Sequence, residues 1–529
     1  CSLKICTMLS GKIFSSSARN SSRALFHGGS SLNTTLANVE VTANAPVDFK
    51  EALPFESIPG PSNWPVVKGI PWFYTMEGLG KERAQEVLFA CFRKYGSIWK
   101  APDLPFREGH TVALYKPESI REVFQHEGLY PERDFLNCVG VYRKLNPDIY
   151  KNDGVAIANG KSWADIRSKV QPVLMRVNEI EPYLKDIDSI SLEFADNIKK
   201  TKNIQGMVED FYTTVTRWTL EMAGMIALNT KLGCLDPDIE SNSEAFKMIN
   251  SAKNFQQGVI DLDFNVPLYK LFATAQWNAF VEAQRTIERI GLRYINVQRN
   301  KIEETDTADR SVMKSLLNKM GLDASESIVM LLDMMIAGID TTGSTLTFNT
   351  YCLASHPEYQ KKVYDEINTL FPDKNQPLAL NKLRQMTYLK ASIKEALRLF
   401  PIFDVISRRV KRDIVIEGYQ IPKNTTCALA AGISGLLQEN FDDPHSFIPE
   451  RWVRGSPQQC EYPKYSYLPF GSGSRMCVGK NLAEIQLLAG TTRLLQNFHI
   501  EYDGPVPEKR FKMVNIPHGH LRFKFIERT

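Results

Sequence analysis

The stretch PFGSGSRMCVG, residues 469–479, surrounds one cysteine, Cys477, with three glycines, a phenylalanine and an arginine. In the segment that follows, Leu482, Ile485 and Leu488 recur at helical spacing, which predicts a helix that begins just after the cysteine. A helix N-terminus favours a thiolate, because the anion meets the positive end of the helix dipole and free N–H groups. We therefore expect the pKa of Cys477 to be lowered and its sulfur to serve as a ligand.

The residues around the cysteine indicate what kind of ligand it meets. Gly471, Gly473 and Gly479 let the backbone lie against a flat object. Arg475 offers a fixed fork of donors for a carboxylate, and Phe470 offers a flat face. A thiolate, a close flat approach and a carboxylate partner together suit haem, with the iron on the sulfur and a propionate on the arginine. The alternative is a glycine-rich loop around a buried thiol.

Composition excludes some classes of protein. The chain has 529 residues, a net charge of +4 and nine cysteines, and a charge this small does not indicate nucleic-acid binding. The cysteines show no CxxC pair and no zinc-ligand spacing, and their odd number leaves a thiol unpaired, which favours a reducing compartment. No apolar run reaches the roughly 20 residues that a membrane-spanning helix needs. The longest run, residues 328–339, is interrupted by Asp333.

The N-terminal region differs from the rest of the chain. Residues 1–39 contain no acidic residue, are rich in serine and carry scattered basic residues. This composition is typical of a mitochondrial transit peptide, and a plain disordered tail is the alternative. Residues 40–54 are predicted to be a linker, because the proline- and glycine-rich stretch 53–69 indicates a boundary. Residues 55–529 then form one folding unit.

The pattern of apolar residues predicts a mainly α fold. Residues 282–304 and 357–371 have apolar positions three and four apart beside charged faces. Residues 325–355 contain no proline and would form a helix roughly 45 Å long. Because its first half is apolar nearly all round, this helix is expected to run through the middle of the molecule. Strand-like segments at 110–115 and 413–430 predict a small β-rich region.

The stretch FGSGSRMCVG resembles the cytochrome P450 signature FxxGxRxCxG at every fixed position. The resemblance implies the cytochrome P450 fold, a large helical domain with a long central helix and a small β-rich region. It also implies haem b as cofactor, with Cys477 as the axial thiolate ligand of the iron and with Phe470 and Arg475 in the haem site. Further motifs of the family follow one another in family order across residues 163–479.

Two of these motifs concern residues around the haem loop. KEALRLFP places Glu395 and Arg398 in the family's ExxR arrangement, although an ordinary surface ion pair has the same spacing. FIPERW resembles the PERF element, so the resemblance implies that Arg451 joins them in a buried charge triad that holds the cysteine loop. SWADIR matches WxxxR, in which Trp163 and Arg167 are implied to contact a haem propionate.

Two further motifs leave alternatives open. Arg408 stands where the family has another propionate-binding arginine, but Arg409 follows it directly. AGIDTT lies in the middle of the long predicted helix. The resemblance implies that Asp340 and Thr341 manage water and protons for oxygen cleavage, a step that needs protons and a site without bulk water. Alternatively, Thr341 and Thr342 bond back to carbonyls of their own helix.

Basic residues indicate the type of P450. The microsomal type carries an N-terminal membrane helix, which the sequence does not predict. Lys390 and Lys394 lie one helical turn apart ahead of the ExxR pair. Mitochondrial P450s resemble this and use such residues to dock an acidic [2Fe–2S] ferredoxin. Lys480 is expected to extend the patch, although Asn481 stands where the family often has a second basic residue. A solvated charged face is the alternative for the lysine pair.

The sequence of residues 160–175 and 267–283 resembles that of insect mitochondrial P450s, a group that includes ecdysteroid hydroxylases and xenobiotic oxidisers. The resemblance implies a monooxygenase that inserts one oxygen atom from O2 into a lipophilic substrate, with the xenobiotic class favoured. NADPH electrons would arrive through a ferredoxin reductase and the ferredoxin, and the protein would bind peripherally to the matrix side of the inner membrane. The alternatives are a P450-fold isomerase or dehydratase that does not use O2, and a non-catalytic haem-thiolate sensor.

Overall fold

The structure is a computed structural model. It describes residues 48–61, 66–67, 70–71, 81–102, 109–134, 136–304, 312–318 and 324–528. The predicted tail, residues 1–39, lies outside the described residues, and so does the linker up to residue 47. Residues 48–54 lie against the folded unit, because the N–H of Leu53 donates to the carbonyl of Gly418 and its own carbonyl accepts from Gln420. The described residues from Asp48 onward form one compact unit.

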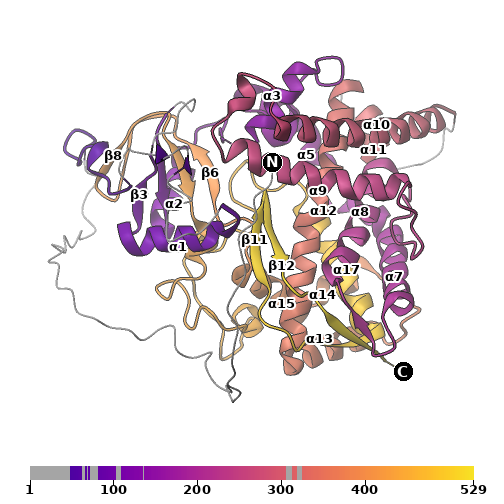
Figure 1. The fold of residues 1–529 in the computed structure, drawn as a ribbon. Helices are drawn as coiled ribbons and strands as arrows, with labels where there is room; N and C mark the ends of the chain where they lie inside the picture. The colour runs from indigo at the N-terminus through magenta and orange to yellow at the C-terminus, as the bar shows by residue number, and fades with distance from the viewer. Residues whose placement is uncertain are drawn as a thin grey trace, which may run out of the picture. The chain divides into compact units, whose positions relative to one another are not determined.

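Helices make up most of this unit, so the predicted mainly α fold is confirmed (Figure 1). The helices are α1 (Ala84–Tyr95), α2 (Pro117–His126), α3 (Asn137–Leu145), α4 (Gly154–Ile157), α5 (Gly160–Leu174), α6 (Val177–Ile180), α7 (Leu184–Thr201), α8 (Phe211–Leu228), α9 (Glu244–Asp263), α10 (Ala275–Glu304), α11 (Val312–Asn318), α12 (Ala324–Ser355), α13 (Pro357–Leu370), α14 (Leu380–Gln385), α15 (Tyr388–Leu399), α16 (Ala431–Ser434) and α17 (Lys480–Asn497).

The strands form small sheets, and the strand-like segments 110–115 and 413–430 contain four of them, as predicted. The largest sheet has the order β3-β4-β9-β6, in which β4 and β9 are parallel and the other pairs antiparallel. The strands are β1 (Val66–Val67), β2 (Ile70–Pro71), β3 (Ile98–Lys100), β4 (Thr111–Leu114), β5 (Met207–Val208), β6 (Ile406–Arg409), β7 (Ile414–Ile416), β8 (Tyr419–Ile421), β9 (Thr426–Leu429), β10 (Phe498–Glu501), β11 (Glu508–Lys512), β12 (Val514–His518) and β13 (Phe523–Glu527).

The long helix α12 is the centre of the helical region, as its apolar sequence predicts. It packs against α8, α15 and α17, which surround it in Figure 1. Glycine permits the close packing of the neighbouring pair α8 and α17, because a Cβ at Gly490 would lie 2.9 Å from the indole of Trp218. Within the described part of the chain, α12 is the one helix with the length and composition of a membrane span, and most of that stretch is buried inside the protein.

The carboxylate that interrupts the apolar half of α12 has a buried partner. Asp333 forms an ion pair with Arg143 of α3, and both side chains are almost fully buried. Beside them, Glu288 of α10 accepts hydrogen bonds from Tyr142 at 2.9 Å and from Tyr150 at 2.6 Å. Buried polar groups of this kind require such partners, since an unpaired buried charge is costly. The network therefore fixes α3 against α10 and α12.

Candidate haem site

The cysteine loop, residues 469–479, is shaped by two glycines with positive φ. Gly471 has φ +71° and Gly473 has φ +73°, a conformation that residues with a Cβ rarely adopt. A Cβ at Gly473 would also lie 2.6 Å from the carboxylate of Glu127. The loop closes through a hydrogen bond from the N–H of Cys477 to the carbonyl of Phe470, at 2.9 Å. This fold of the loop leaves Cys477 exposed at the start of α17.

The electrostatic surroundings of Cys477 differ from the sequence-based prediction. The pKa of its thiol is raised, because the protein that encloses the side chain removes water even though the residue remains accessible. The N–H of Gly479 and the positive charges of Arg167 and Arg133 act in the opposite direction, but they are outweighed. The predicted lowering of the pKa by the helix end is therefore wrong for the protein alone. A bound metal cation would supply the positive charge that the thiolate needs.

Four guanidinium groups lie near the cysteine loop; we call them the arginine cluster. Its members are Arg133, Arg167, Arg408 and Arg475. Burial and the repulsion of neighbouring arginines lower the pKa of Arg475 to about 9, and burial and Arg408 lower that of Arg133 to about 10. Glu127 and Glu132 act against this lowering at Arg475 but do not cancel it. The site therefore favours added negative charge.

Arg475 has donors that no described residue satisfies. Its Nε and Nη1 are buried without a hydrogen-bond partner in the part of the chain that the structure describes. Its Nη2 donates to Asn159 at 3.1 Å and to the carbonyl of Ala158, and its guanidinium lies 4.6 Å from the ring centre of Trp163. Buried donors without acceptors are rare in folded proteins and indicate a missing partner. The carboxylates of haem b, which carries two propionates, fit these donors and the charge of the arginine cluster.

The structure distinguishes Arg408 from its neighbour. Arg408 is almost fully buried, donates to Glu127 at 2.6 Å and reaches the carbonyl of Ser472 in the cysteine loop at 3.4 Å. Arg409 instead donates its backbone N–H to the carbonyl of Glu132. Arg408 is therefore the one of the two whose side chain contacts the cysteine loop, whereas the Nε of Arg409 is buried without a described partner.

The ExxR and PERF residues meet in the interior. Glu395 accepts two hydrogen bonds from Arg398, at 2.7 and 2.9 Å, and one from Arg451 at 3.1 Å. The indole of Trp452 and the N–H of Ile448 donate to the same carboxylate, at 2.8 and 3.1 Å. All three charged side chains are buried. This arrangement excludes an ordinary surface ion pair for Glu395 and Arg398.

Thr341 and Asp340 of α12 have different hydrogen-bond partners. The hydroxyl of Thr341 donates to the carbonyl of Ala337 at 2.8 Å, which is the back-bonded arrangement considered above. The carboxylate of Asp340 accepts from the hydroxyl of Tyr212 at 2.7 Å and from the amide of Gln256. Burial raises the pKa of Asp340 to about 6, and the Tyr212 hydrogen bond lowers it in part. Asp340 is thus nearer to neutral than an ordinary aspartate.

The three predicted docking lysines have different exposures. Lys394 is exposed, with its ammonium 5.8 Å from the ring centre of Trp452. Lys390 is half-buried, which lowers its pKa, and it donates to the carbonyl of Arg384. Lys480 lies 3.9 Å from Glu484, a residue that also acts on the charge of Lys390. Lys390 and Lys480 therefore share Glu484 as a neighbouring charge.

Sequence reasoning did not identify several residues of these sites. Glu127 and Arg133 follow α2 and belong to no motif; they meet the cysteine loop because Glu132 pairs with β6. Tyr212 and Gln256 lie on helices far from Asp340 in the sequence, and nothing in their spacing indicated the contact. Each depends on how distant elements pack, which one sequence does not provide.

Comparisons with known proteins agree with this geometry. The Cytochrome P450 family model matches residues 58–525. The chain is 32% identical over 467 residues to a Drosophila melanogaster protein named probable cytochrome P450 12a5, mitochondrial, covering 84% of this chain and 85% of the relative. It is 29% identical over 498 residues to probable cytochrome P450 301a1, mitochondrial, of the same fly, covering 90% and 88%. Cytochrome P450 CYP12A2 of Musca domestica is 31% identical over 441 residues, covering 79% and 81%.

The buried carboxylate of Glu395 yields a prediction about stability. In Glu395→Ala, the guanidinium groups of Arg398 and Arg451 lose their anion, and we expect the free energy of unfolding to fall by about 3–5 kcal/mol. Chemical unfolding with and without haem measures this. Asp365→Ala is the control, because it removes an exposed ion pair with Lys361 and should cost at most about 0.5 kcal/mol. Equal unfolding midpoints for the two variants would show that the triad does not stabilise the fold.

Proposed function

Because the chain belongs to the cytochrome P450 family of haem-thiolate enzymes, we propose that it is a mitochondrial monooxygenase that inserts one oxygen atom from O2 into a lipophilic substrate. Its electrons come from NADPH through a ferredoxin reductase and a [2Fe–2S] ferredoxin. The observation that carries this proposal is the pairing of an exposed Cys477 with the positive charge of the arginine cluster, in which the unmet donors of Arg475 suit the carboxylates of a dianionic cofactor.

In this proposal the chain's own residues hold the cofactor and fix its environment. Cys477 is the ligand of the iron, and Phe470 lies beside the cofactor. Trp163 and the arginine cluster hold the propionates. The cofactor is haem b, whose thiolate-bound iron supplies the power to activate O2. Glu395, Arg398 and Arg451 keep the loop that carries the ligand in place.

The face of α12 that carries Ala337 is proposed to border the site of oxygen chemistry. Ala337 is exposed and Thr341 half-buried, although both lie in the middle of the central helix. A Cβ at Gly338 would approach only the Cβ of Ala223, at 3.9 Å, so there is room above this turn. Thr341 can hold a water or a proton there once its hydroxyl turns from the Ala337 carbonyl. Asp340 is the proton source behind it.

The mitochondrial assignment is supported by the relatives, two of which are named as mitochondrial proteins. The resemblance of residues 162–175 to insect mitochondrial P450s leads us to propose a xenobiotic rather than an ecdysteroid as the substrate. The segment 402–405, between α15 and β6, includes the buried Asp404. That carboxylate accepts from Gln85 and Asn515, at 2.8 and 2.7 Å, so it joins α1 and β12 to this segment. Spectral binding of steroids and of small lipophilic toxins to the purified holoenzyme distinguishes the two substrate classes.

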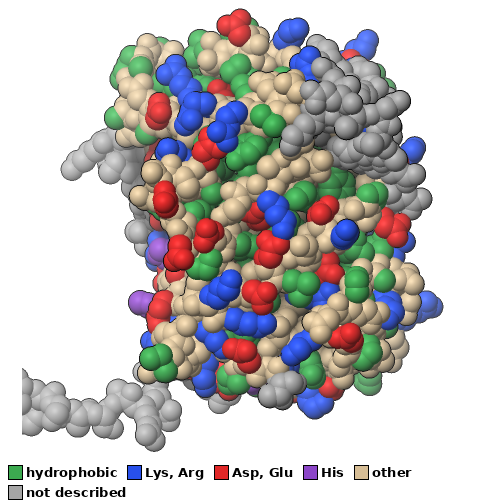
Figure 2. All heavy atoms as spheres, turned by 90° about the vertical axis from the view of Figure 1, so that its right-hand side faces the viewer, with side chains coloured by type: hydrophobic (Ala, Val, Ile, Leu, Met, Phe, Trp, Pro, Cys, Tyr) green, Lys and Arg blue, Asp and Glu red, His purple; other side chains and the backbone are tan. Residues whose placement is uncertain are grey.

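The distribution of basic side chains on the molecular surface determines where the acidic ferredoxin can bind. On the face seen in Figure 2, acidic and basic side chains are interspersed and form no continuous basic stripe. We assign the ferredoxin to the lysine patch, residues Lys390, Lys394 and Lys480. Two of these lie on α15, which also carries Glu395 and Arg398, so the patch is rigidly connected to the support of the cysteine loop.

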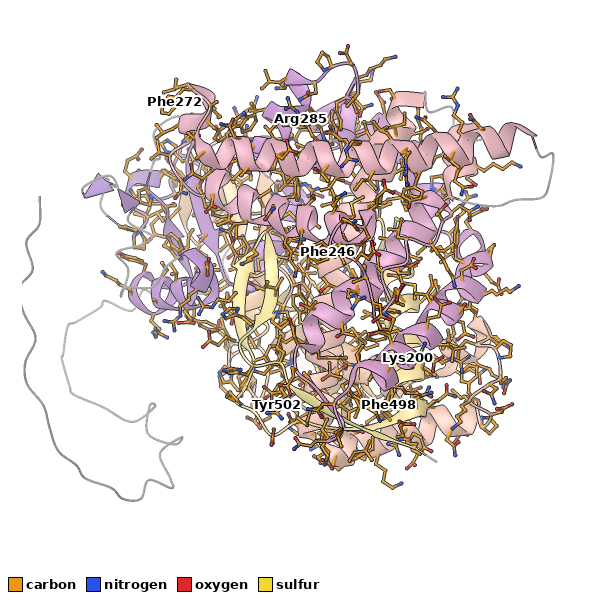
Figure 3. All side chains as sticks on the ribbon, turned by 45° about the vertical axis from the view of Figure 1, so that its right-hand side comes forward. Lys200, Phe246, Phe272, Arg285, Phe498 and Tyr502 are labelled. Atoms are coloured by element: carbon orange, nitrogen blue, oxygen red, sulfur yellow. The ribbon has the colours of Figure 1, made fainter. Side chains whose placement is uncertain are left out.

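Exposed apolar side chains between α9 and α10 are proposed to bind the membrane. Leu268, Leu271 and Phe272 are 43%, 65% and 58% exposed, and Lys270 among them is exposed as well. Figure 3 shows Phe272 at the outer end of the turn that precedes α10. Apolar side chains beside a basic one suit the boundary of a bilayer that contains anionic lipids. This turn would hold the enzyme peripherally on the matrix side of the inner membrane.

The central test of the proposed function is Cys477→Ser. A serine cannot provide a thiolate, so we expect the reduced, carbon-monoxide-bound enzyme to lose the red-shifted absorption of a thiolate haem and product formation to cease. Cys460→Ser is the matched control, because Cys460 is partly exposed and bonds only to the carbonyl of Glu461 among the contacts described. An unchanged spectrum in Cys477→Ser would exclude this ligand. Product formation that needs neither NADPH nor O2 would favour the isomerase alternative.

The docking proposal predicts the effect of charge reversal. Lys390→Glu with Lys394→Glu should slow reduction of the haem by ferredoxin by about tenfold or more at low salt, since such patches mainly accelerate association. At about 0.15 M salt, screening over roughly 8 Å should reduce the difference. Stopped-flow reduction measures the rate, and Lys199→Glu with Lys200→Glu on α7 is the control. Wild-type rates and salt dependence in the α15 variant would leave a solvated helix face as the explanation.

The membrane proposal predicts weaker vesicle binding for Leu271→Ser with Phe272→Ser. Loss of two apolar side chains should reduce co-flotation with vesicles of inner-membrane lipid composition by about tenfold or more. Ile204→Ser provides the comparison, because Ile204 is fully exposed in the turn after α7. The proposal fails if the double variant floats with vesicles as well as the wild type does.

A further inference from the structure

Asp340 is a buried carboxylate with two neutral donors, and no described residue forms an ion pair with it. Its side chain belongs to the centre of α12 and is 7% exposed. Tyr212, in the first turn of α8, donates to one oxygen at 2.7 Å, and Gln256 of α9 donates to the other. Tyr212 also lies 3.4 Å from the hydroxyl of Ser344, one turn further along α12. These contacts hold the carboxylate on the side of α12 that faces α8 and α9.

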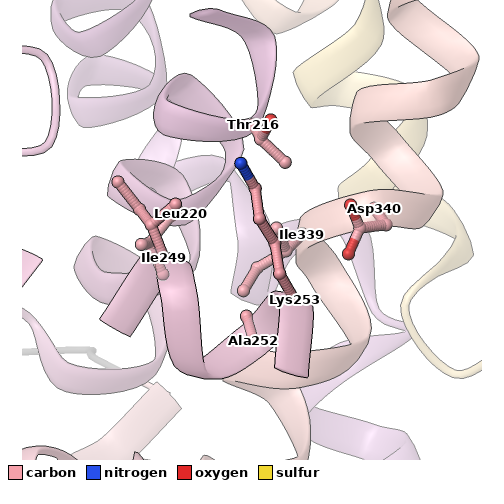
Figure 4. Close-up of a pocket in the computed structure, with 7 residues that line it drawn as sticks. All are labelled: Thr216, Leu220, Ile249, Ala252, Lys253, Ile339 and Asp340. Carbon is pink, nitrogen blue, oxygen red and sulfur yellow. The ribbon is translucent and has the colours of Figure 1, made fainter. Parts of the chain in front are cut away.

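A small pocket leads to this carboxylate. Figure 4 shows its lining, which comes from the three helices α8, α9 and α12: Thr216, Leu220, Ile249, Ala252, Lys253, Ile339 and Asp340. Lys253 is exposed, whereas Thr216 and Asp340 are buried, so the pocket connects the solvent side to the interior. It has room for about one water molecule, and Thr216, Lys253 and Asp340 are polar partners for it.

The charges around Asp340 allow it to carry a proton. Burial raises its pKa to about 6, while the hydroxyl of Tyr212 and the ammonium groups of Lys253 and Lys512 lower it. Lys253 belongs to α9 and Lys512 to β11, and Asp210 acts on Tyr212 from the start of α8. A group with a pKa close to the working pH can both accept and release a proton readily.

We propose that Asp340 receives protons through this pocket and that Tyr212 and Gln256 are positioning residues that hold its carboxylate between the pocket and the face of α12 that carries Thr341. This inference rests on the monooxygenase function proposed above. A pocket water donates a proton to the carboxylate and is reprotonated from solvent. The neutral carboxyl then turns, exchanges one of its two hydrogen bonds and gives the proton to a water beside the Thr341 hydroxyl, and that water passes a proton on to the site of oxygen chemistry, where the reaction consumes it. Asp340 returns to the carboxylate, with no net change in the protein.

Tyr212→Phe tests the positioning role. Loss of the hydroxyl removes a donor that lowers the pKa of Asp340, so that pKa should rise above about 6. Infrared titration of the resting holoenzyme measures this directly, with the carboxyl band assigned by its absence in Asp340→Asn. We also expect the amount of product formed per NADPH consumed to fall by roughly tenfold and the amount of peroxide released to rise, because a proton carrier would be lost. In the wild type, the coupling, which is the product formed per NADPH consumed, should decrease as the pH rises through about 6. In Tyr212→Phe that decrease should occur at a higher pH.

Ala252→Leu tests the pocket without touching a polar group. The larger side chain fills the lining of α9, so product per NADPH should fall and peroxide should rise, with an increased solvent isotope effect. Ile249→Leu, which conserves volume at a neighbouring position of the lining, should behave as the wild type. Tyr294→Phe on α10 is the control for loss of a tyrosine hydroxyl.

Two results would overturn the proposal. If Tyr212→Phe lowers the melting temperature but leaves the Asp340 titration and the coupling unchanged, Tyr212 only packs α8 against α12. If Ala252→Leu remains fully coupled, protons do not pass through the pocket. Failure of the monooxygenase proposal looks different: the wild type would form no NADPH-dependent product with any ferredoxin, whereas the infrared titration would still report whether Tyr212 controls Asp340.

Discussion

The fully buried carboxylate of Glu395 is the constraint on which the haem site depends. It pairs with both Arg398 and Arg451, and Arg398 in turn donates to the carbonyls of Gly435, Pro444 and Ser446. A buried charge group of this kind adds little net stability, but removal of one member leaves a charge without compensation. The carboxylate therefore fixes the path of the chain that leads to the cysteine loop.

The connection from this carboxylate to the cysteine loop can be followed through two aromatic residues. The indole of Trp452 donates to Glu395 and packs on the ring of Tyr467, with 4.6 Å between ring centres. Tyr467 directly precedes Leu468 and the loop, and its hydroxyl donates to the carbonyl of Lys394 on α15 at 3.1 Å. The same helix thus carries the exposed Lys394, the half-buried Lys390, the buried acid and the support of the loop. A partner that binds at Lys394 would contact a rigid element one turn from the interior charges.

The sequence predicted those elements whose structure depends on residues close to one another in the chain. The signature around Cys477, the spacing of Glu395 and Arg398, and the apolar run of α12 are contained within single segments, so the loop, the ion pair and the central helix could be predicted. The pKa of Cys477 could not, because burial by distant residues outweighs the helix end. Contacts such as Glu127 with Arg408, 281 residues apart, depend on how the segment after α2 meets β6, where Glu132 and Arg409 form a β-bridge. No periodicity in one sequence provides that information.

The two aspartates of α12 show how environment separates a structural from a chemical role. Asp333 and Asp340 lie two helical turns apart in the same buried helix. Asp333 pairs with the guanidinium of Arg143, an opposite charge that ties α12 to α3. Among the described residues, Asp340 is contacted by the neutral donors Tyr212 and Gln256, and burial raises its pKa to about 6. The different partners suit the two carboxylates to different roles: the first joins two helices through an ion pair, whereas the second, beside a small pocket, is the one that we propose to exchange a proton.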